Sequence, residues 1–151
     1  MELFCFASKN LTNIWAGIGA NLWAVAQTSD SDMRARITKS QKMRVGSFGL
    51  LYCNEVHSFT TPFIIYTMPD PIKKIDNIWP EKNWRLPFSI HPLGNPTKQL
   101  HKDKAKERWP ILIKSKLESV SAAMHITGTT VFVPVIIASE DLEIILQDLK
   151  I

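Results

Sequence analysis

The chain is best understood from Trp79-Pro80-Glu81-Lys82-Asn83-Trp84-Arg85-Leu86-Pro87-Phe88-Ser89-Ile90-His91-Pro92-Leu93. From Phe88 to Leu93 apolar and polar residues alternate, and this period of two predicts a strand with one buried face. The preceding residues 72–86 carry prolines and polar residues without a regular period, so we expect an irregular surface segment there. The stretch therefore predicts a half-exposed strand that is entered through an aromatic loop.

Apolar runs on either side predict further strands, namely Leu3–Ala7, Leu22–Ala26, Phe48–Cys53 and Thr60–Met68. We expect short helices from Asn10 or Thr12 to Ala16, within 34–42, across 117–125, and after a capping Ser139. The glycines of Gly17-Ile18-Gly19 are expected to close the first of these helices. About five or six strands with short helices between them predict an α+β fold with a closed or strongly bent sheet, in a single domain over residues 1–151.

Composition limits the classes of function without choosing one. The chain has 151 residues and a net charge of +4, and its basic residues concentrate in 34–44 and 98–108 while its last stretch is acidic. Such a chain can present one basic face to phosphate groups. No apolar run has the roughly 20 residues of a membrane span. Cys5 and Cys53 lie far apart in apolar segments, so we expect buried free thiols in a reducing, cytoplasmic protein without a membrane partner.

Signals for catalysis, a metal or a cofactor are missing from the sequence. The two cysteines and four histidines show none of the paired spacings of zinc ligands. There is no G-x-S-x-G motif, and Gly17-x-Gly19 lacks the third glycine and the preceding strand of a dinucleotide fingerprint. We therefore expect a binding protein without metal or cofactor, and no enzyme.

Five tryptophans are many for a small domain, and two of them indicate a ligand. Trp79 and Trp84 flank a polar stretch, where large apolar rings need something to stack on. A nucleobase gains about 1–3 kcal/mol from each aromatic face, and Lys82 and Arg85 are close enough in sequence to meet phosphate. Arg34 and Arg36 follow the predicted Trp23 strand and are candidates for the same role. The alternative is that both rings fold back and plug one end of the barrel.

The order of these pieces resembles a known family. Phe6-Ala7-Ser8-Lys9-Asn10 is followed by a helix, Leu22-Trp23-Ala24-Val25, Lys42-Met43-Arg44-Val45-Gly46-Ser47, the Trp79–Leu93 stretch and Ile126-x-Gly128. This pattern is similar to the EVE domain of the PUA-like superfamily, whose structural relative is the YTH domain. It departs from the EVE pattern at Ser47, where aspartate is usual. The resemblance covers nearly the whole chain and implies a PUA-like barrel.

The resemblance also implies a function, which is to take one modified, extruded base of DNA or RNA into an aromatic cage. Carried over by position, Trp23, Trp79 and Trp84 correspond to the cage, and Ser8 and Asn10 to the residues that touch the base edge. Ala24 stands where YTH domains have a small hydroxyl residue, so base-edge bonding there has to use the backbone. Lys9, Arg34, Arg36, Lys82 and Arg85 are then the expected phosphate contacts.

Two functional hypotheses from this resemblance stay open. One is a reader of methylated DNA, acting as the targeting module of a modification-dependent restriction system with a fused or associated NTPase or nuclease effector. The other is a PUA-like RNA-binding module that recognises RNA shape, an unmodified base or N6-methyladenine. A catalytic domain with an unrecognised site is the third alternative.

Overall fold

A computed structural model describes residues 1–81, 83–115 and 118–151. Its strands are β1 (Glu2–Ser8), β2 (Leu22–Ala26), β3 (Phe48–Cys53), β4 (Ser58–Ile65), β5 (Lys74–Ile75), β6 (Trp84–Pro92), β7 (Gln99–His101) and β8 (Val135–Ile136). Its helices are α1 (Leu11–Ala20), α2 (Asp30–Ser40), α3 (Lys102–Arg108), α4 (Pro110–Lys114), α5 (Val120–Ala123) and α6 (Ser139–Leu149), and Gly128–Thr130 form a 3₁₀ turn. Helices and strands share the chain, which confirms the predicted α+β class.

The strands form one strongly curved sheet in the order β2-β6-β4-β3-β1-β8, and β5 and β7 pair with β6 and β4 at its margins. Strands β1 and β3 are parallel, and the other paired strands are antiparallel. The six-strand path agrees with the predicted bent sheet. It does not close on itself, because no ladder joins β1 to β2 among the described residues.

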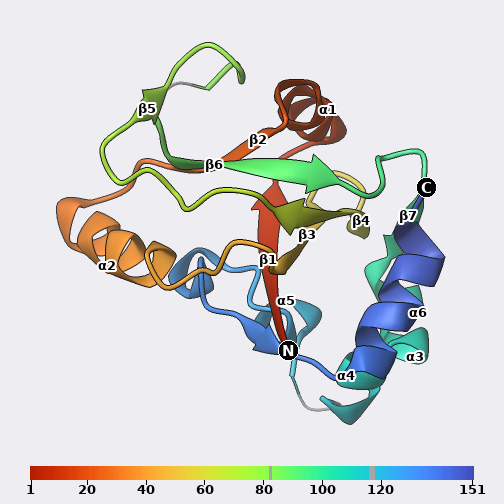
Figure 1. The fold of residues 1–151 in the computed structure, drawn as a ribbon. Helices are drawn as coiled ribbons and strands as arrows, with labels where there is room; N and C mark the ends of the chain where they lie inside the picture. The colour runs from red at the N-terminus through yellow and green to blue at the C-terminus, as the bar shows by residue number, and fades with distance from the viewer. Residues whose placement is uncertain (82, 116–117) are drawn as a thin grey trace.

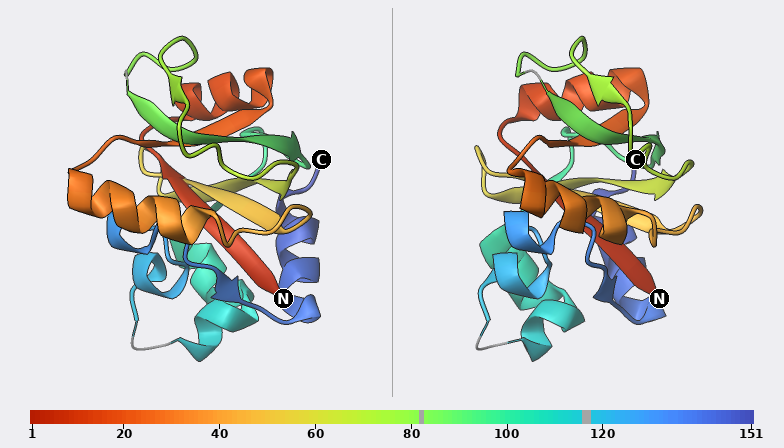
Figure 2. Two further views of the ribbon diagram at one scale, coloured as in Figure 1. Left: turned by 60° about the vertical axis from the view of Figure 1, so that its left-hand side comes forward. Right: turned by 90° about the vertical axis from the view of Figure 1, so that its left-hand side faces the viewer.

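Strand β1 is buried on both faces and separates two hydrophobic cores. Phe4 and Phe6 point into a core that also contains residues of β2, β6 and α1. Leu3 and Cys5 point the opposite way, into a core completed by α3 to α6. This alternation follows from the period of two along a strand. Figure 1 and Figure 2 show β1 running between α1 with β6 on one side and the C-terminal helices on the other.

Helix α1 continues past the point at which the sequence predicts its end. Gly17 and Gly19 lie inside the helix, and Asn21 ends it in the left-handed conformation (φ 51°, ψ 42°). The Asn21 N–H donates to the carbonyls of Gly17 and Ile18, which is the usual way of satisfying the last turn. The prediction that Gly17-Ile18-Gly19 closes the helix is therefore wrong, because asparagine tolerates the terminating conformation as well.

Other predicted boundaries also shift. Helix α2 begins at Asp30, where Ser29 caps it, and so it starts ahead of the range 34–42 in which the sequence predicts a helix. The helix expected across 117–125 is reduced to α5 in the residues that the structure describes, with Ser119 as its cap. Both cysteines are buried and free, as predicted. None of the helices in the described part of the chain is long and apolar enough to cross a membrane.

The start of α6 depends on a buried carboxylate instead of the predicted Ser139 cap. Asp141 is 3% exposed and accepts the backbone N–H groups of Ala138 and Ile111, each at 2.9 Å. It thereby fixes the ends of α6 and α4 to each other. The sequence shows the acidic residues at this helix start, but not that one of them is shared with a second helix.

We predict that Asp141→Ala destabilises the fold, because two buried N–H groups lose their acceptor. Each unsatisfied group costs about 1–3 kcal/mol. The neighbouring Glu140→Ala is the control, since Glu140 is exposed and its carboxylate makes none of these bonds. Urea unfolding of both variants measures the difference. Equal midpoints for the two variants would show that the Asp141 bonds contribute nothing.

Candidate functional site

The interval between β1 and β2 is where the curved sheet remains unpaired, and we call it the seam. Strand β2 pairs with β6 alone, and β1 pairs with β8 only through Glu2 and Leu3. The second half of β1 and all of β2 therefore present free edges to each other. A free strand edge carries backbone N–H and C=O groups that can bind another group.

The ladders determine which backbone groups face the seam. Met1 exchanges hydrogen bonds with Ile137, while the Ser8 carbonyl accepts from Asn54 on the β3 side. Because successive residues alternate along a strand, the backbone groups of Cys5 and Ala7 face the seam. Neither backbone makes a further hydrogen bond to another loop or turn among the described residues.

The same argument applies to β2. Asn21 accepts from Ile90 and Gln27 donates to Asn83, so the odd-numbered residues between them bond to β6. The register shift between Trp23 and Val25 adds its extra residue to β6, which leaves β2 regular. The backbone groups of Ala24 and Ala26 therefore face the seam.

A cavity of about 200 Å³ occupies the seam. It is lined by Cys5, Phe6, Ala7, Trp23, Ala24, Val25, Ala26, Arg36, Trp84, Ile126, Gly128 and Val131. All four residues whose backbone faces the seam are in this lining. Burial raises the pKa of the Cys5 thiol far above its ordinary value, so the cysteine is neutral there. The cavity thus combines apolar side chains with backbone hydrogen-bonding groups.

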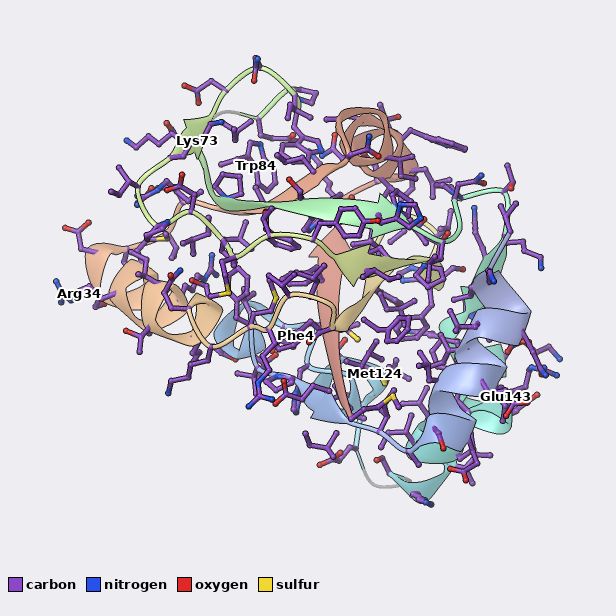
Figure 3. All side chains as sticks on the ribbon, in the orientation of Figure 1. Phe4, Arg34, Lys73, Trp84, Met124 and Glu143 are labelled. Atoms are coloured by element: carbon purple, nitrogen blue, oxygen red, sulfur yellow. The ribbon has the colours of Figure 1, made fainter. Side chains whose placement is uncertain are left out.

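Three tryptophans meet at this cavity. The Trp79 ring stands edge-on to Trp23 with centroids 5.6 Å apart, and it packs on Trp84 at 5.1 Å. Trp23 and Trp84 line the cavity, although Trp23 is only 4% exposed, and Trp79 packs on both of them without lining it. In Figure 3, Trp84 lies above β6 and below the loop that contains β5. The structure thus brings the three predicted cage residues together, with Trp79 placed as the support between the other two.

The tryptophan loop is attached to the first turn of α1. Trp79 Nε1 donates to the carbonyl of Asn13 at 2.8 Å, and Trp84 Nε1 donates to the carbonyl of Glu81 at 2.7 Å. Glu81 in turn accepts from the side-chain amide of Asn13 at 3.2 Å. Asn13 is 3% exposed, and its Oδ1 has no hydrogen-bond partner among the described residues. A buried polar atom without a partner is unusual, but Asn13 does not line the cavity, and its observed bonds make it a support of the tryptophan loop.

Sequence reasoning missed Asn13 and Glu81. Asn13 lies three residues after the capping Asn10, inside a predicted helix, where an asparagine has no obvious role. The available signal is its polarity on the helix face that also carries Ile14 and Gly17, which are buried. Glu81 lies in the polar stretch between the tryptophans, and its position there indicates nothing more than a loop.

Arg36 joins β2, at the edge of the seam, to the 3₁₀ turn. Its Nη1 donates to the Ala26 carbonyl at 2.8 Å and its Nη2 to the Gly128 carbonyl at 3.3 Å. Burial lowers the pKa of this guanidinium, and the carboxylate of Asp32 opposes that shift. A guanidinium stays protonated in proteins and has five N–H donors, so donors remain for a ligand. Its observed bonds hold β2 and the 3₁₀ turn at a fixed separation.

The predicted base-edge residues lie where β1 passes into α1. Ser8 is buried and its Oγ donates to the Asn10 carbonyl at 2.9 Å. Asn10 caps α1, with its Oδ1 accepting from Asn13 N at 2.8 Å. Both side chains therefore hold the turn that positions Asn13. Lys9, between them, is exposed and 3.8 Å from Glu81 Oε1.

The remaining predicted phosphate contacts are dispersed. Arg34 is exposed on the outer side of α2, away from the sheet (Figure 3). Arg85 donates to Gln27 Oε1 at 2.9 Å and to the Pro71 carbonyl at 3.1 Å, and so fixes the segment before β5. Lys82 lies outside the described residues. Of the described members of this group, Arg36 alone lines the cavity.

Comparisons with known proteins identify the fold. Neither protein-family models nor curated protein sequences give a match. Among solved structures, the Pho92 YTH domain in complex with m6A is 12% identical, with a TM-score of 0.64 over 97% of this chain and 82% of that one. The YTH domain of Zygosaccharomyces rouxii MRB1, in complex with N6-methyladenosine RNA, is 13% identical, with a TM-score of 0.61 over 97% and 84%.

A bacterial structure shares the fold as well. Protein Atu2648 from Agrobacterium tumefaciens is 14% identical, with a TM-score of 0.53 over 98% of this chain and 93% of that one. These likenesses show a YTH-like fold and fit the relation that the sequence resemblance implied. Assignment to the EVE domain itself stays a prediction.

We predict that Gly17→Ala disturbs the tryptophan cluster. A Cβ at Gly17 would lie 2.8 Å and 2.9 Å from two Trp23 ring carbons and 3.0 Å from the Leu22 carbonyl oxygen. Such overpacking typically costs about 1–3 kcal/mol. Gly19→Ala on the same helix is the matched control, because a Cβ there meets nothing within 4 Å. Its expected effect is a stabilisation of about 0.5–1 kcal/mol from the better helix propensity of alanine.

Chemical denaturation and near-ultraviolet circular dichroism distinguish the two variants. Gly17→Ala should lose stability and change the tryptophan signal, whereas Gly19→Ala should keep the wild-type spectrum. An unchanged spectrum in stable Gly17→Ala protein would mean that the helix does not set the Trp23 position.

Proposed function

We propose that this chain is a nucleic-acid reader that takes one extruded, modified base into the seam cavity. The observation that carries the proposal is the cavity itself, in which two tryptophans line a space bordered by two free strand edges. Its volume of about 200 Å³ is below the roughly 300–1,000 Å³ of sites for drug-sized ligands. That size suits one small planar group.

The lining supports a base better than an aliphatic ligand. A base is flat, so it can stack on Trp23 or Trp84, and each such contact is worth about 1–3 kcal/mol. It also has donors and acceptors around its edge, which the backbone groups of Ala7 and Ala24 can meet. Extrusion from a stack costs a few kcal/mol, so both kinds of contact are needed to offset it.

A methyl group on the base edge suits the same cavity. Ala24, Ala26, Ile126 and Val131 present apolar surface. An unmodified exocyclic amine has two N–H donors, and a donor buried against such surface without an acceptor is costly. A methylated amine has one donor for a backbone carbonyl and one methyl for the apolar wall. The cavity is therefore expected to prefer the methylated base.

The remaining residues take supporting roles in this proposal. Trp79 supports the two wall tryptophans, and Ser8 and Asn10 hold the turn that positions Asn13 beneath Trp79. Lys9, Arg34, Arg36 and Arg85 supply positive charge for the phosphates, and Lys82 is assigned the same role from its sequence position. Binding of this kind requires no catalytic group, and we propose that the protein is not an enzyme. Residues 1–151 then act as one reader domain.

N6-methyladenine in RNA is the first ligand to test. Two of the similar structures are described as complexes with m6A or N6-methyladenosine RNA. The DNA-reading, restriction-targeting role that the EVE resemblance implies needs the same cavity and an effector beyond this chain. Methylated DNA, including 5-methylcytosine, therefore belongs in the same binding panel.

We predict that Trp84→Ala weakens binding of an N6-methyladenosine RNA by about 10- to 100-fold, because one stacking face is removed. Trp84 is only half-buried, so its removal disturbs the core less than removal of Trp23. Trp15→Ala is the matched control, because Trp15 is 45% exposed on α1 and does not line the cavity. Isothermal titration against methylated and unmethylated RNA of one sequence gives both affinities.

The expected result is a preference for methylated RNA in the wild type and in Trp15→Ala, and its loss in Trp84→Ala. Equal affinity of the wild-type protein for both RNAs, with binding still dependent on Trp84, would instead favour the unmodified-base alternative. Folded Trp84→Ala protein that keeps the full preference would exclude the seam cavity as the reading site.

A further inference from the structure

The seam cavity is the first of three adjoining hollows along one side of α2. The middle hollow, of about 370 Å³, lies between α2 and residues 127–131, and shares Arg36, Gly128 and Val131 with the seam cavity. The far hollow, of about 250 Å³, is floored by Phe4, Phe132 and Pro134. Lys39 lines both of these hollows. We call these three adjoining hollows together the groove.

The α2 wall of the groove is basic. Arg36 and Lys39 are one helical turn apart and face the 3₁₀ turn, where Lys39 Nζ donates to the Thr129 carbonyl at 3.4 Å. Lys42 follows the end of the helix, is exposed, and its side chain makes no ion pair or hydrogen bond within the described residues. The groove also contains two carboxylates, Asp32 in the middle hollow and Glu2 in the far one.

The opposite wall differs in chemistry. Thr127 and Thr129 bring hydroxyl groups to the middle hollow, and Val131 is apolar. Val133 and Pro134 continue the apolar surface into the far hollow. A basic wall facing an apolar and hydroxyl-bearing one suits an extended single strand, whose phosphates and whose sugars and bases lie on different sides. A compact anion would need convergent donors, which this long groove does not offer.

We propose that the groove along α2 holds the nucleotides on one side of the extruded base, with Lys39 and Lys42 contacting their phosphates. This inference rests on the proposed function, because the strand enters the groove where its base enters the seam cavity. Arg36 stands at the junction of the two spaces and holds their common wall. The reader surface is then the seam cavity with an extension along α2, on one side of the extruded base.

Salt-dependent binding tests this assignment. Lys39→Gln/Lys42→Gln removes two charges from the groove, and Lys106→Gln/Lys114→Gln removes the same charge from α3 and α4. The control lysines are exposed and line none of the three hollows, and their helices α3 and α4 lie apart from α2 in Figure 1. The probes are N6-methyladenosine nucleoside, N6-methyladenosine RNAs extended only 5′ or only 3′ of the base, and the unmethylated RNAs.

The groove variant should bind the nucleoside as the wild type does. It should lose the gain in affinity from one of the two extensions, and its slope of log K against log salt should fall by about 0.7 for each phosphate that the protein no longer neutralises. The control variant should keep the flank-dependent gain. A groove variant that matches the control variant in slope and in both extensions overturns the groove, even where the base still binds.

A different result is expected if the seam cavity does not bind the base. The nucleoside and the methylated base would then show no Trp84-dependent binding in any variant. The unmethylated RNAs still report on the groove in that case, through the difference in salt slope between the two lysine variants. If the two lysine variants have the same salt slope with unmethylated RNA, the groove is contradicted, whatever the cavity binds.

Discussion

The unpaired interval between β1 and β2 is the constraint on which the site depends. A sheet curved this strongly brings its end strands close together, and a ladder between them would fill the space with hydrogen bonds. Here the small side chains Ala7, Ala24 and Ala26 leave room, and Arg36 joins the Ala26 carbonyl of β2 to the Gly128 carbonyl of the 3₁₀ turn. The guanidinium thus holds β2 in place without a ladder to β1, and the backbone groups of Cys5, Ala7 and Ala24 keep no strand partner across the seam within the described residues.

The tryptophan cluster combines the two alternatives that the sequence left open. Trp79 behaves as a plug, since it does not line the cavity and its indole N–H is bonded to the Asn13 carbonyl. Trp23 and Trp84 behave as walls, since both reach the cavity. Rings held by a third ring have less freedom to lose on stacking, which would lower the entropic cost of the proposed base binding. Burial and binding are therefore compatible in one cluster.

The sequence predicted what depends on local periodicity. Alternation in β1 and in Phe88–Leu93, and the meeting of Trp79 and Trp84 with the Trp23 strand, were readable from spacing or resemblance. Contacts between distant segments were not. Nothing local shows that Arg36 bonds to Gly128, that Asn13 accepts from Trp79, or that Asp141 is shared by α4 and α6. The end of α1 was also missed, because Asn21, and neither Gly17 nor Gly19, takes the left-handed conformation that ends the helix.

Strand β1 has a consequence for how far such a chain can diverge. Its two faces belong to different cores. Phe4 and Phe6 pack in the core beside the cavity, and Leu3 and Cys5 pack in the core of the C-terminal helices. Substitutions among the C-terminal helices can be compensated within their own core, because volume-conserving changes in one core are tolerated. The cavity side therefore depends on where β1 lies, and not on which residues pack against the opposite face of the strand. Identities of 12–14% with chains of the same fold are compatible with this separation.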